Sequence, residues 1–556
     1  MKILGIWAAI AAVISAPANA AITVPVNANG TPDLTVVLAN AQVSYFTGSS
    51  AATPFLEEAL RTECDVTHGS PIYKFISSTA AEVYICSKAD SVTNFSNTFL
   101  VLHKRDGGGS INGVKNALGT YSNFVDMTSA TTVTSCSAAK NSISTCTGGN
   151  VTISATAQQA DVGLADVDAA QFASPLNGGV AGTAGVTNIP IAVQIFGIVV
   201  SLNLRNAMQA AEAATGMLPS SCASGASKLG SVRETEDCMP NLTSNQVSTI
   251  LANNNFTDWT NLTYSGNNRT VSVYDASGAL DTAAPANSNI HICARTAGSG
   301  TWAIANIKFE NAPCSGDSQA FQTASSQTLQ NETAAAVSGA QKLIHSMRGA
   351  GDVDSCLSGL STGANIGTFT WYTTGVQDNV NGTNNSRYAI GPQGTDRNTD
   401  LSNDYRFIKI DNASPSAYNI VAGRWTFFAE LIAVSSSTIA YPPANLLAAD
   451  LLRLMSQPAH IANLNALTFA ANKGLQTWGK VAGFMSVAPN SRYPATNLFT
   501  IDNITNTGYD PAYPVSPYTH SKSNGAALNH CRRPALPGSS VSRTATTITP
   551  AFYPTY

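Results

Sequence analysis

"HICARTAGSGTWAIANIKF", residues 291–309, runs from an apolar segment through a Gly-Ser-Gly turn into a second apolar segment. The pattern predicts a strand near 290–294 and a helix that begins at Ser299 and carries Trp302 and Ile304. The turn lacks the lysine of a Walker loop and the spacing of a dinucleotide fingerprint. It does place a fixed positive charge, Arg295, four residues before the serine. One such loop is only weak evidence for anion binding, so the interpretation depends on whether similar loops occur elsewhere in the chain.

Two other segments have the same order of strand, small-residue turn and helix. Strand is expected within 33–46, followed by a Gly/Ser turn and a helix that begins near Pro54. A strand at 98–103 precedes a glycine-rich turn and a helix from Ser110. The recurrence predicts an α/β fold with ligands bound at the strand ends.

Five further segments have a predicted structure. The apolar run 189–200 is too short to span a bilayer and is expected to be a buried strand. Within 242–262, Thr243 and Gln246 form a capping box that starts a helix. Residues 444–455 predict an amphipathic helix. Residues 134–146 are expected to form an exposed loop closed by a disulfide, and 376–404 an inserted surface loop.

The composition excludes several classes of protein. The chain has 556 residues and 44% hydrophobic residues, but only 11% charged ones, against about 25% in ordinary soluble domains. The net charge of −4 predicts no basic face for nucleic acid or for an acidic membrane. No period of 20–50 residues repeats, which excludes a solenoid.

The N-terminus is typical of an export signal. Lys2 precedes an apolar run at 3–14, and Ala18-Asn19-Ala20 fits a small-x-small cleavage site. We therefore expect residues 1–20 to be a signal peptide and the mature chain to be periplasmic or secreted, without a membrane span. A buried N-terminal helix is the alternative. Since no cysteine follows the cleavage point, a lipid anchor there is not expected.

Ten cysteines in an exported chain predict disulfides. Their spacing favours pairing of neighbours, although sequence alone does not fix the connectivity. The pairs so predicted are Cys64–Cys86, Cys136–Cys146, Cys222–Cys238 and Cys293–Cys314, with Cys356 and Cys531 left over. The chain has no CxxC motif, and its seven histidines lie far from most cysteines, so no metal site and no cofactor is expected.

Three predicted helix starts present hydroxyl groups, namely Ser50, Ser110 and the run Ser299-Gly300-Thr301. Helix N-termini attract anions because free backbone N–H groups and the helix dipole point there. If the three converge, Arg295 can add a fork-shaped positive charge to two oxygens of the same anion. For each serine alone, ordinary N-capping is the favoured interpretation, so convergence remains a hypothesis.

Several segments, in their order along the chain, resemble one family. The segments are "TGSSAATPF" (47–55), "GGSINGV" (108–114), "ADVGLADVDAAQF" (160–172), the helix with its Trp-Asn pair (242–262), "RTAGSGT" (295–301) and, more faintly, "NIGTF" (365–369) and "ASPSAYNIVAGRW" (413–425). Together they resemble the phosphate-binding proteins of ABC transporters, which share the periplasmic-binding-protein type 2 fold. The match spans roughly 45–430.

This resemblance implies a two-lobed α/β clamp for a small oxyanion, with an ABC permease as a partner. Residues 21–188 would form the first part of lobe 1 and 189–375 lobe 2. Residues 376–556 would return to lobe 1, with an insertion and a C-terminal extension. The implied ligand-binding residues are Ser50, Ala51, Ser110 and Asp166 from lobe 1, and Arg295, Ser299, Gly300 and Thr301 from lobe 2.

The carboxylate of Asp166 fits an anion site only if the ligand itself carries a proton. A carboxylate accepts a hydrogen bond from phosphate, which still carries an O–H, but it repels a fully ionised sulfate. Such a site discriminates because the wrong ligand leaves a buried group unpaired. Arg295 would supply attraction and Asp166 selectivity. Alternatively, Asp166 caps a helix or pairs with Arg295 in an empty cleft.

Some features depart from the family. Ala51 stands where the family has an aromatic residue, and the chain is much longer, with cysteines and an extended C-terminus. A secreted surface or matrix protein that keeps the clamp without transport is therefore the alternative. An enzyme is not expected, because Ser299 lacks the Gly-x-Ser-x-Gly elbow and His291 fits a core histidine better than a catalytic base.

Overall fold

The computed structural model describes residues 22–66, 70–78, 80–252, 256–278, 280, 282, 284–285, 287–315, 342–363, 386–470, 483–488, 514–522 and 526–535. The predicted signal peptide and the segment 365–369 lie outside these residues, as does the first part of the predicted insertion.

The fold is a mixed α/β structure built on one large sheet. The fourteen-stranded sheet has the order β13-β12-β14-β8-β17-β7-β1-β4-β3-β2-β6-β5, and β15 and β18 also pair with β8. The strands are β1 (Ala41–Gly48), β2 (Ile72–Ser77), β3 (Ala81–Ser87), β4 (Phe99–Arg105), β5 (Ser135–Cys136), β6 (Ile143–Thr147), β7 (Val162–Ala165), β8 (Thr187–Ser201), β9 (Asn241–Leu242), β10 (Thr263–Gly266), β11 (Arg269–Ser272), β12 (Ile290–Arg295), β13 (Lys342–Met347), β14 (Ala389–Gly394), β15 (Tyr405–Phe407), β16 (Lys409–Ile410), β17 (Phe428–Ser435), β18 (Phe484–Met485), β19 (Ser521–Lys522) and β20 (Ala526–Leu528).

Helices cover this sheet. They are α1 (Leu34–Ala39), α2 (Thr53–Glu63), α3 (Ile111–Ala117), α4 (Met127–Ala130), α5 (Leu202–Ala214), α6 (Ser244–Leu251), α7 (Gly300–Glu310), α8 (Ala350–Thr362), α9 (Ala417–Val421), α10 (Leu446–Met455) and α11 (Pro458–Ala470). None of these described helices is long and apolar enough to cross a bilayer.

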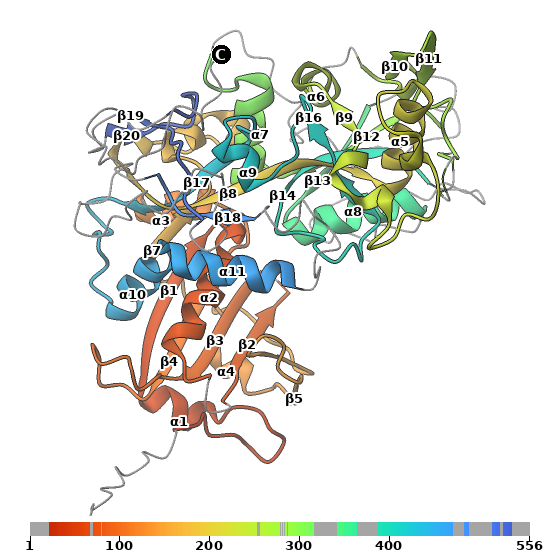
Figure 1. Cartoon of the computed structure of the whole chain (residues 1–556). Helices are drawn as coiled ribbons and strands as arrows, with labels where there is room; N and C mark the ends of the chain where they lie inside the picture. The colour runs from red at the N-terminus through yellow and green to blue at the C-terminus, as the bar shows by residue number, and fades with distance from the viewer. Residues whose placement is uncertain are drawn as a thin grey trace, which may run out of the picture.

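Strand β8 joins two groups of strands. Its first part pairs antiparallel with β17, and residues 196–200 pair with β14. We call the strands β1–β7 with β17 the β1 side, and β12–β15 the β12 side. Figure 1 shows β1–β4 in the lower part of the molecule and α5, α6 and α8 at the upper right, with β8 running between them. Thirteen of the fifteen residues of β8 are buried, which confirms the predicted buried strand and explains its continuous apolar run.

The central strands of both sides run parallel to their neighbours. Strand β1 pairs in parallel with β4 and β7, and β12 pairs in parallel with β13 and β14. Parallel strands present their carboxyl ends at one edge, where α/β proteins bind ligands. The predicted loops all follow such ends, after Gly48, Arg105, Ala165 and Arg295.

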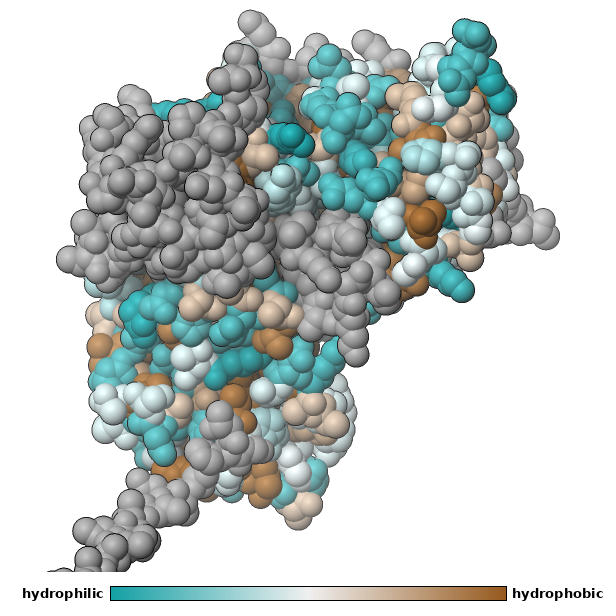
Figure 2. Space-filling view, in the orientation of Figure 1, coloured by the Kyte–Doolittle hydropathy of each residue, from teal (hydrophilic) through white to brown (hydrophobic). Residues whose placement is uncertain are grey.

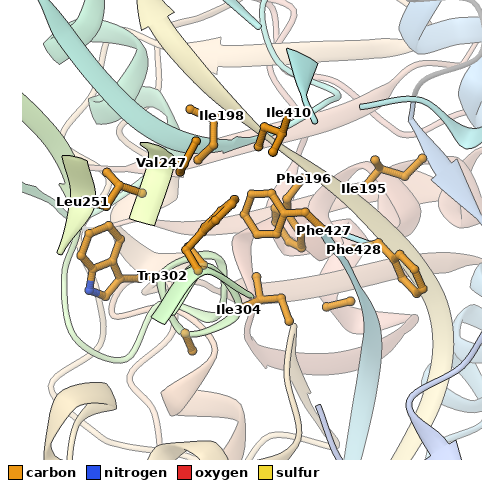
Figure 3. Packing of buried hydrophobic residues seen from close by; sticks show 14 of the residues in the cluster. Ile195, Phe196, Ile198, Val247, Leu251, Trp302, Ile304, Ile410, Phe427 and Phe428 are labelled. Atoms are coloured by element: carbon orange, nitrogen blue, oxygen red, sulfur yellow. The ribbon is translucent and has the colours of Figure 1, made fainter. Parts of the chain in front are cut away.

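One apolar core extends over both sides of the molecule. It includes Val114 of α3, Phe196 of β8, Trp302 of α7 and Phe427. Figure 3 shows side chains of β8 and α7 gathered with Phe427 and Phe428 in the same layer. On the visible face, hydrophilic residues predominate and hydrophobic ones are scattered (Figure 2). The two sides are therefore joined by packed apolar side chains as well as by β8.

Most predicted helix starts are confirmed. Pro54 lies in the first turn of α2, and the capping box of Thr243 and Gln246 begins α6. Helices α3 and α7 begin directly after Ser110 and Ser299, and α10 occupies most of 444–455. These signals are local hydrogen-bonding patterns, which explains why sequence alone reveals them.

Three local predictions are wrong in part. The predicted surface loop at 376–404 contains strand β14, whose residues are all buried in the large sheet. Within 33–46, β1 confirms the strand from Ala41 on, but Leu34–Ala39 form helix α1, because the Asp33 carboxylate accepts hydrogen bonds from the backbone N–H groups of Thr35 and Val36. The predicted loop at 134–146 contains strands β5 and β6, which pair antiparallel. Its disulfide Cys136–Cys146 is present as expected.

All ten cysteines form disulfides. Cys64–Cys86 and Cys222–Cys238 are confirmed, but Cys293–Cys314 is wrong. Cys293 of β12 pairs with Cys356 of α8, and Cys314 pairs with Cys531. Helix α8 contacts β12, so packing between elements distant in sequence determines these pairs, which spacing could not reveal.

Candidate anion site

The first loop turns sharply between β1 and α2. At Gly48, with φ +117°, a Cβ atom would lie 1.9 Å from the carbonyl oxygen of Leu164, so only glycine fits. The next residue, Ser49, caps a short 3₁₀ turn, η1 (Ser50–Ala52), by accepting the backbone N–H of Ala51 at 3.0 Å. The Ser49 hydroxyl also donates a hydrogen bond to Asp166 Oδ1. Ser49, which the sequence analysis missed, is thus the residue of this loop that contacts Asp166.

The predicted residues Ser50 and Ala51 directly follow Ser49 along the chain. Both are half-buried in η1. No described side-chain bond joins Ser50 to Asp166. A signal for Ser49 was available in the sequence, because a serine directly after a tight glycine turn and before a helix is a typical N-cap.

The second loop places Ser110 against Asp166. The Ser110 hydroxyl is fully buried and accepts the backbone N–H of Asp166 at 3.2 Å. Within its own helix, Ser110 makes no side-chain capping bond. Of the two interpretations of this serine, ordinary N-capping of α3 is therefore wrong.

The third loop approaches from the β12 side. Ser299 caps α7 by accepting the backbone N–H of Trp302 at 3.4 Å, so ordinary capping holds for this serine. A Cβ atom on Gly300 would lie 2.6 Å from both Asp166 Oδ2 and Ser110 Oγ. The N-terminus of α7 is therefore packed directly onto Asp166 and Ser110. The loops also bond to each other, since the backbone N–H of Ile111 donates to the carbonyl of Gly298 at 3.0 Å.

Arg295 ends β12 just before this loop and is 3% exposed. Its Nη2 donates to the carbonyl of Arg348 at 3.1 Å, whereas its Nε is buried and has no hydrogen-bond partner among the described residues. Burial lowers the pKa of the guanidinium, and the charges of Asp166 and Asp352 oppose that change. The group stays protonated, as arginine does in proteins.

Asp166 and Arg295 attract each other without forming an ion pair among the described contacts. Burial raises the pKa of the Asp166 carboxyl, and hydrogen bonds with Ser49 and Ser110 together with the Arg295 charge only partly offset this. The alternative in which these two residues neutralise each other directly is thus not observed. Asp166 is not a helix cap either, because Asp168 precedes the next helical turn, η2 (Ala169–Ala173).

We call Ser49, Ser110, Asp166, Arg295, Ser299 and Gly300 the Asp166 junction. Of the residues predicted from sequence, the structure brings Ser110, Asp166 and Gly300 into contact, with Ser299 and Arg295 adjoining them. Thr301 is buried in the first turn of α7, and Ser50 and Ala51 lie at the margin. The junction thus combines three serine hydroxyls, the N-terminus of the eleven-residue helix α7, a guanidinium nitrogen without a partner among the described residues, and a carboxyl of raised pKa.

The C-terminal segment 514–535 contacts both sides of this junction. The backbone N–H of His530 donates to Asp168, two residues beyond Asp166, at 2.8 Å. The adjacent Cys531 is bonded to Cys314, which follows α7. The described residues of the segment therefore tie the loop after β7 to the end of α7.

No protein-family model and no curated protein sequence matches this chain. Among solved structures, a putative phosphate ABC transporter substrate-binding protein with bound phosphate from Clostridium perfringens is 13% identical, with 76% of this chain and 97% of that chain covered and a TM-score of 0.35. PstS from Borrelia burgdorferi is 10% identical, with 74% and 92% covered and a TM-score of 0.28. An ABC-type phosphate transport receptor from Vibrio cholerae is 11% identical, with 73% and 93% covered and a TM-score of 0.31.

These TM-scores describe a loose likeness of backbones. The chain resembles phosphate-binding proteins distantly, and the assignment of the Asp166 junction depends on the contacts of its own residues.

Proposed function

We propose that the chain is an exported protein that binds phosphate or a related small oxyanion at the Asp166 junction. The observation that carries this proposal is the buried Nε of Arg295, which has no hydrogen-bond partner. An unpaired buried donor on a charged group costs free energy, and an anion oxygen would supply the missing acceptor. The N-terminus of α7 would add backbone N–H groups and its dipole.

The second part of the proposal concerns selectivity. Asp166 has a raised pKa and lies beside the hydroxyls of Ser49 and Ser110. A carboxyl in this setting suits an anion that carries its own O–H, because one proton is then shared between the two groups. A fully ionised sulfate offers no such proton, so phosphate should be preferred.

The compartment follows from the disulfides. Five disulfides are typical of oxidising environments, which supports a periplasmic or secreted location. Together with the predicted N-terminal signal, the disulfides support a ligand that is met outside the cytoplasm. The junction is assigned binding and no catalysis, and a phosphatase assay on the purified chain tests that assignment.

Delivery to a permease and retention without transport are the two candidate uses of the site. The link from Cys314 to Cys531, together with the core shared by both sides, favours retention. A transport receptor must open to release its ligand, whereas this link holds the two sides of the junction together. A secreted surface or matrix protein that keeps a bound oxyanion is therefore the second candidate function.

Calorimetry with inorganic phosphate and with sulfate tests the binding proposal. The full chain should bind phosphate, and Arg295→Ala should weaken binding at least about 30-fold, since a buried charged hydrogen bond is worth about 2–5 kcal/mol. Arg424→Ala is the matched control, because Arg424 is exposed. Full affinity in Arg295→Ala, with the fold checked by circular dichroism, would refute the site.

A further inference from the structure

A second buried group of charged side chains lies where the C-terminal segment meets β17. Glu430 of β17 is fully buried, and His520 and His530 of the C-terminal segment are buried beside it. One donor atom from each of the three residues lies within 4.8 Å of the other two. We call these three residues the Glu430 cluster. No sequence pattern indicates this cluster, because ninety residues or more separate Glu430 from the two histidines.

The Glu430 carboxylate is oriented by hydrogen bonds on one oxygen. Its Oε1 accepts the hydroxyl of Thr519 at 2.9 Å and the backbone N–H of His520 at 2.8 Å. The other oxygen, Oε2, lies 2.6 Å from His520 Nδ1 and 3.3 Å from His530 Nε2. Both imidazoles thus approach the same carboxylate oxygen.

His530 is held from behind by a second carboxylate. Its Nδ1 lies 3.0 Å from Asp168 Oδ2, while Nε2 is fully buried and has no hydrogen-bond partner. When Nδ1 donates to Asp168, Nε2 presents a lone pair to Glu430 Oε2. Two facing lone pairs repel unless a positive charge lies between them. A carboxylate behind a histidine is also the usual arrangement around a protein-bound metal.

We propose that Glu430, His520 and His530 bind a divalent transition metal ion of the zinc class, with Asp168 fixing the orientation of His530. Two imidazoles and one carboxylate are a frequent zinc ligand set. In a tetrahedral site with bonds of about 2.0 Å, two ligand atoms lie about 3.3 Å apart. The observed 3.3 Å between His530 Nε2 and Glu430 Oε2 matches this spacing. His520 Nδ1 lies closer, 2.6 Å from Glu430 Oε2, so these two atoms must move apart by about 0.7 Å to admit the ion.

A proton is the competing positive charge. Burial opposes ionisation of His530, but the carboxylates of Asp168 and Glu430 favour its protonated form and raise its pKa to about 9. The backbone N–H of Asp168 also lies 3.0 Å from Nδ1, and in that tautomer Nε2 carries the proton. A metal ion would displace this proton, so the two arrangements differ in metal content and are separable by experiment.

The site would fasten the C-terminal segment to the rest of the molecule. Glu430 lies on β17 and Asp168 in the loop after β7, whereas both histidines come from the segment. Metal binding would therefore be coupled to docking of the segment, as in other structural metal sites. This site lies outside the Asp166 junction, so it goes beyond the proposed oxyanion function and does not depend on it.

Metal content of the full, disulfide-bonded chain tests the proposal. Protein refolded with zinc and dialysed should retain about one zinc ion per chain, as a closed structural site does. His530→Gln and His520→Gln should each reduce the retained zinc at least tenfold, while His460→Gln, which changes a half-buried histidine of α11, should retain it. Circular dichroism and the number of disulfides confirm that each variant is folded.

Cobalt provides a second measurement on the unchanged sequence. Cobalt(II) in place of zinc should give the visible absorption of a four- or five-coordinate site with imidazole ligands. Zinc below about a tenth of an equivalent, with no cobalt spectrum, would overturn the proposal and leave a protonated His530 between two carboxylates. Full zinc retention in folded His530→Gln would overturn it as well, because the ion would then be bound elsewhere.

Discussion

Arg295 and His530 each carry a buried ring or guanidinium nitrogen without a hydrogen-bond partner, yet the two nitrogens differ in chemistry. Arg295 Nε always carries a proton and can only donate. Its guanidinium belongs to the Asp166 junction, where its charge acts on the Asp166 carboxyl. His530 Nε2 can hold a lone pair, and it faces a carboxylate oxygen. The surroundings of Arg295 Nε therefore favour binding of an anion, and those of His530 Nε2 favour binding of a cation.

The contrast extends to two aspartates of one loop. Burial raises the pKa of Asp166, because its hydroxyl partners and Arg295 compensate it incompletely. Two residues further on, hydrogen bonds and the charge of His530 overcome burial and lower the pKa of Asp168. Two aspartates that are both buried therefore have pKa values shifted in opposite directions. What a buried charge can bind is decided by the groups that face it.

The largest expected effect comes from cutting the Cys314–Cys531 disulfide with a double change to serine. The link spans 217 residues, and its loss should cost about 4–5 kcal/mol of stability by the loop-entropy estimate. Zinc retention should fall with it, because Cys531 adjoins His530, whereas phosphate binding at the Asp166 junction should persist. Chemical denaturation and calorimetry measure the two outcomes.

The disulfide Cys136–Cys146 is the control for that change, with a separation of 10 residues. Its removal should cost less, about 3 kcal/mol, and leave zinc retention unchanged. Equal loss of zinc in both double variants would show that the two regions do not respond independently.

Gly300→Ala should weaken phosphate binding at the Asp166 junction and leave the Glu430 cluster unaffected. The added methyl group would lie 2.5 Å from Asp166 Cβ, so either α7 or Asp166 must move. Overpacking of this kind costs about 1–3 kcal/mol, and we expect phosphate affinity to fall about 10- to 100-fold. Calorimetry measures this loss, and zinc content should not change.

Gly185→Ala provides the matched change, since a Cβ atom there would meet no atom within 4 Å. It should preserve phosphate affinity. A similar loss of affinity in both variants would argue against close contact between α7 and Asp166 as the cause.

Asp166→Asn tests the source of selectivity. An amide no longer shares a proton with phosphate and no longer repels sulfate, so the phosphate-over-sulfate preference should fall about tenfold, the worth of one hydrogen bond. Competition calorimetry with both anions gives the ratio. An unchanged ratio would mean that Asp166 does not face the ligand.

The same variant predicts a smaller effect on the ligand-free protein. A raised pKa means that Asp166 contributes its full stability below the unfolded value of 3.8 and loses it as pH rises through the folded pKa. Asp166→Asn should therefore unfold at a higher temperature than the unchanged chain at neutral pH, and the difference should vanish in acid. Thermal unfolding from pH 3 to 7 measures this trend. A difference that grows toward low pH would contradict it.

Local signals allowed much of the Asp166 junction to be predicted from sequence. The turns before Ser110 and Ser299 and the helices after them follow from glycine placement, capping and helical periodicity. Ser49 was missed by one position, because the residue that caps η1 depends on how the chain turns at Gly48. That these loops lie close together could be expected only from the resemblance to phosphate-binding proteins, because periodicity does not indicate which strand ends are neighbours.

The Glu430 cluster could not be predicted in the same way. Its residues have no motif spacing, and both histidines lie in a segment rich in Pro, Ser and Tyr. The pairing of Cys314 with Cys531 escaped prediction for the same reason, because both contacts arise only when the C-terminal segment docks on the folded core. Long-range contacts of this kind are determined by packing.

An experimental structure of the full chain with inorganic phosphate tests the central claim most directly. The account predicts tetrahedral density within hydrogen-bond distance of Arg295 Nε, the N-terminus of α7 and the Asp166 carboxyl. Phosphate bound at any other place, or none at saturating concentration while Arg295 Nε keeps a protein or water partner, would contradict it.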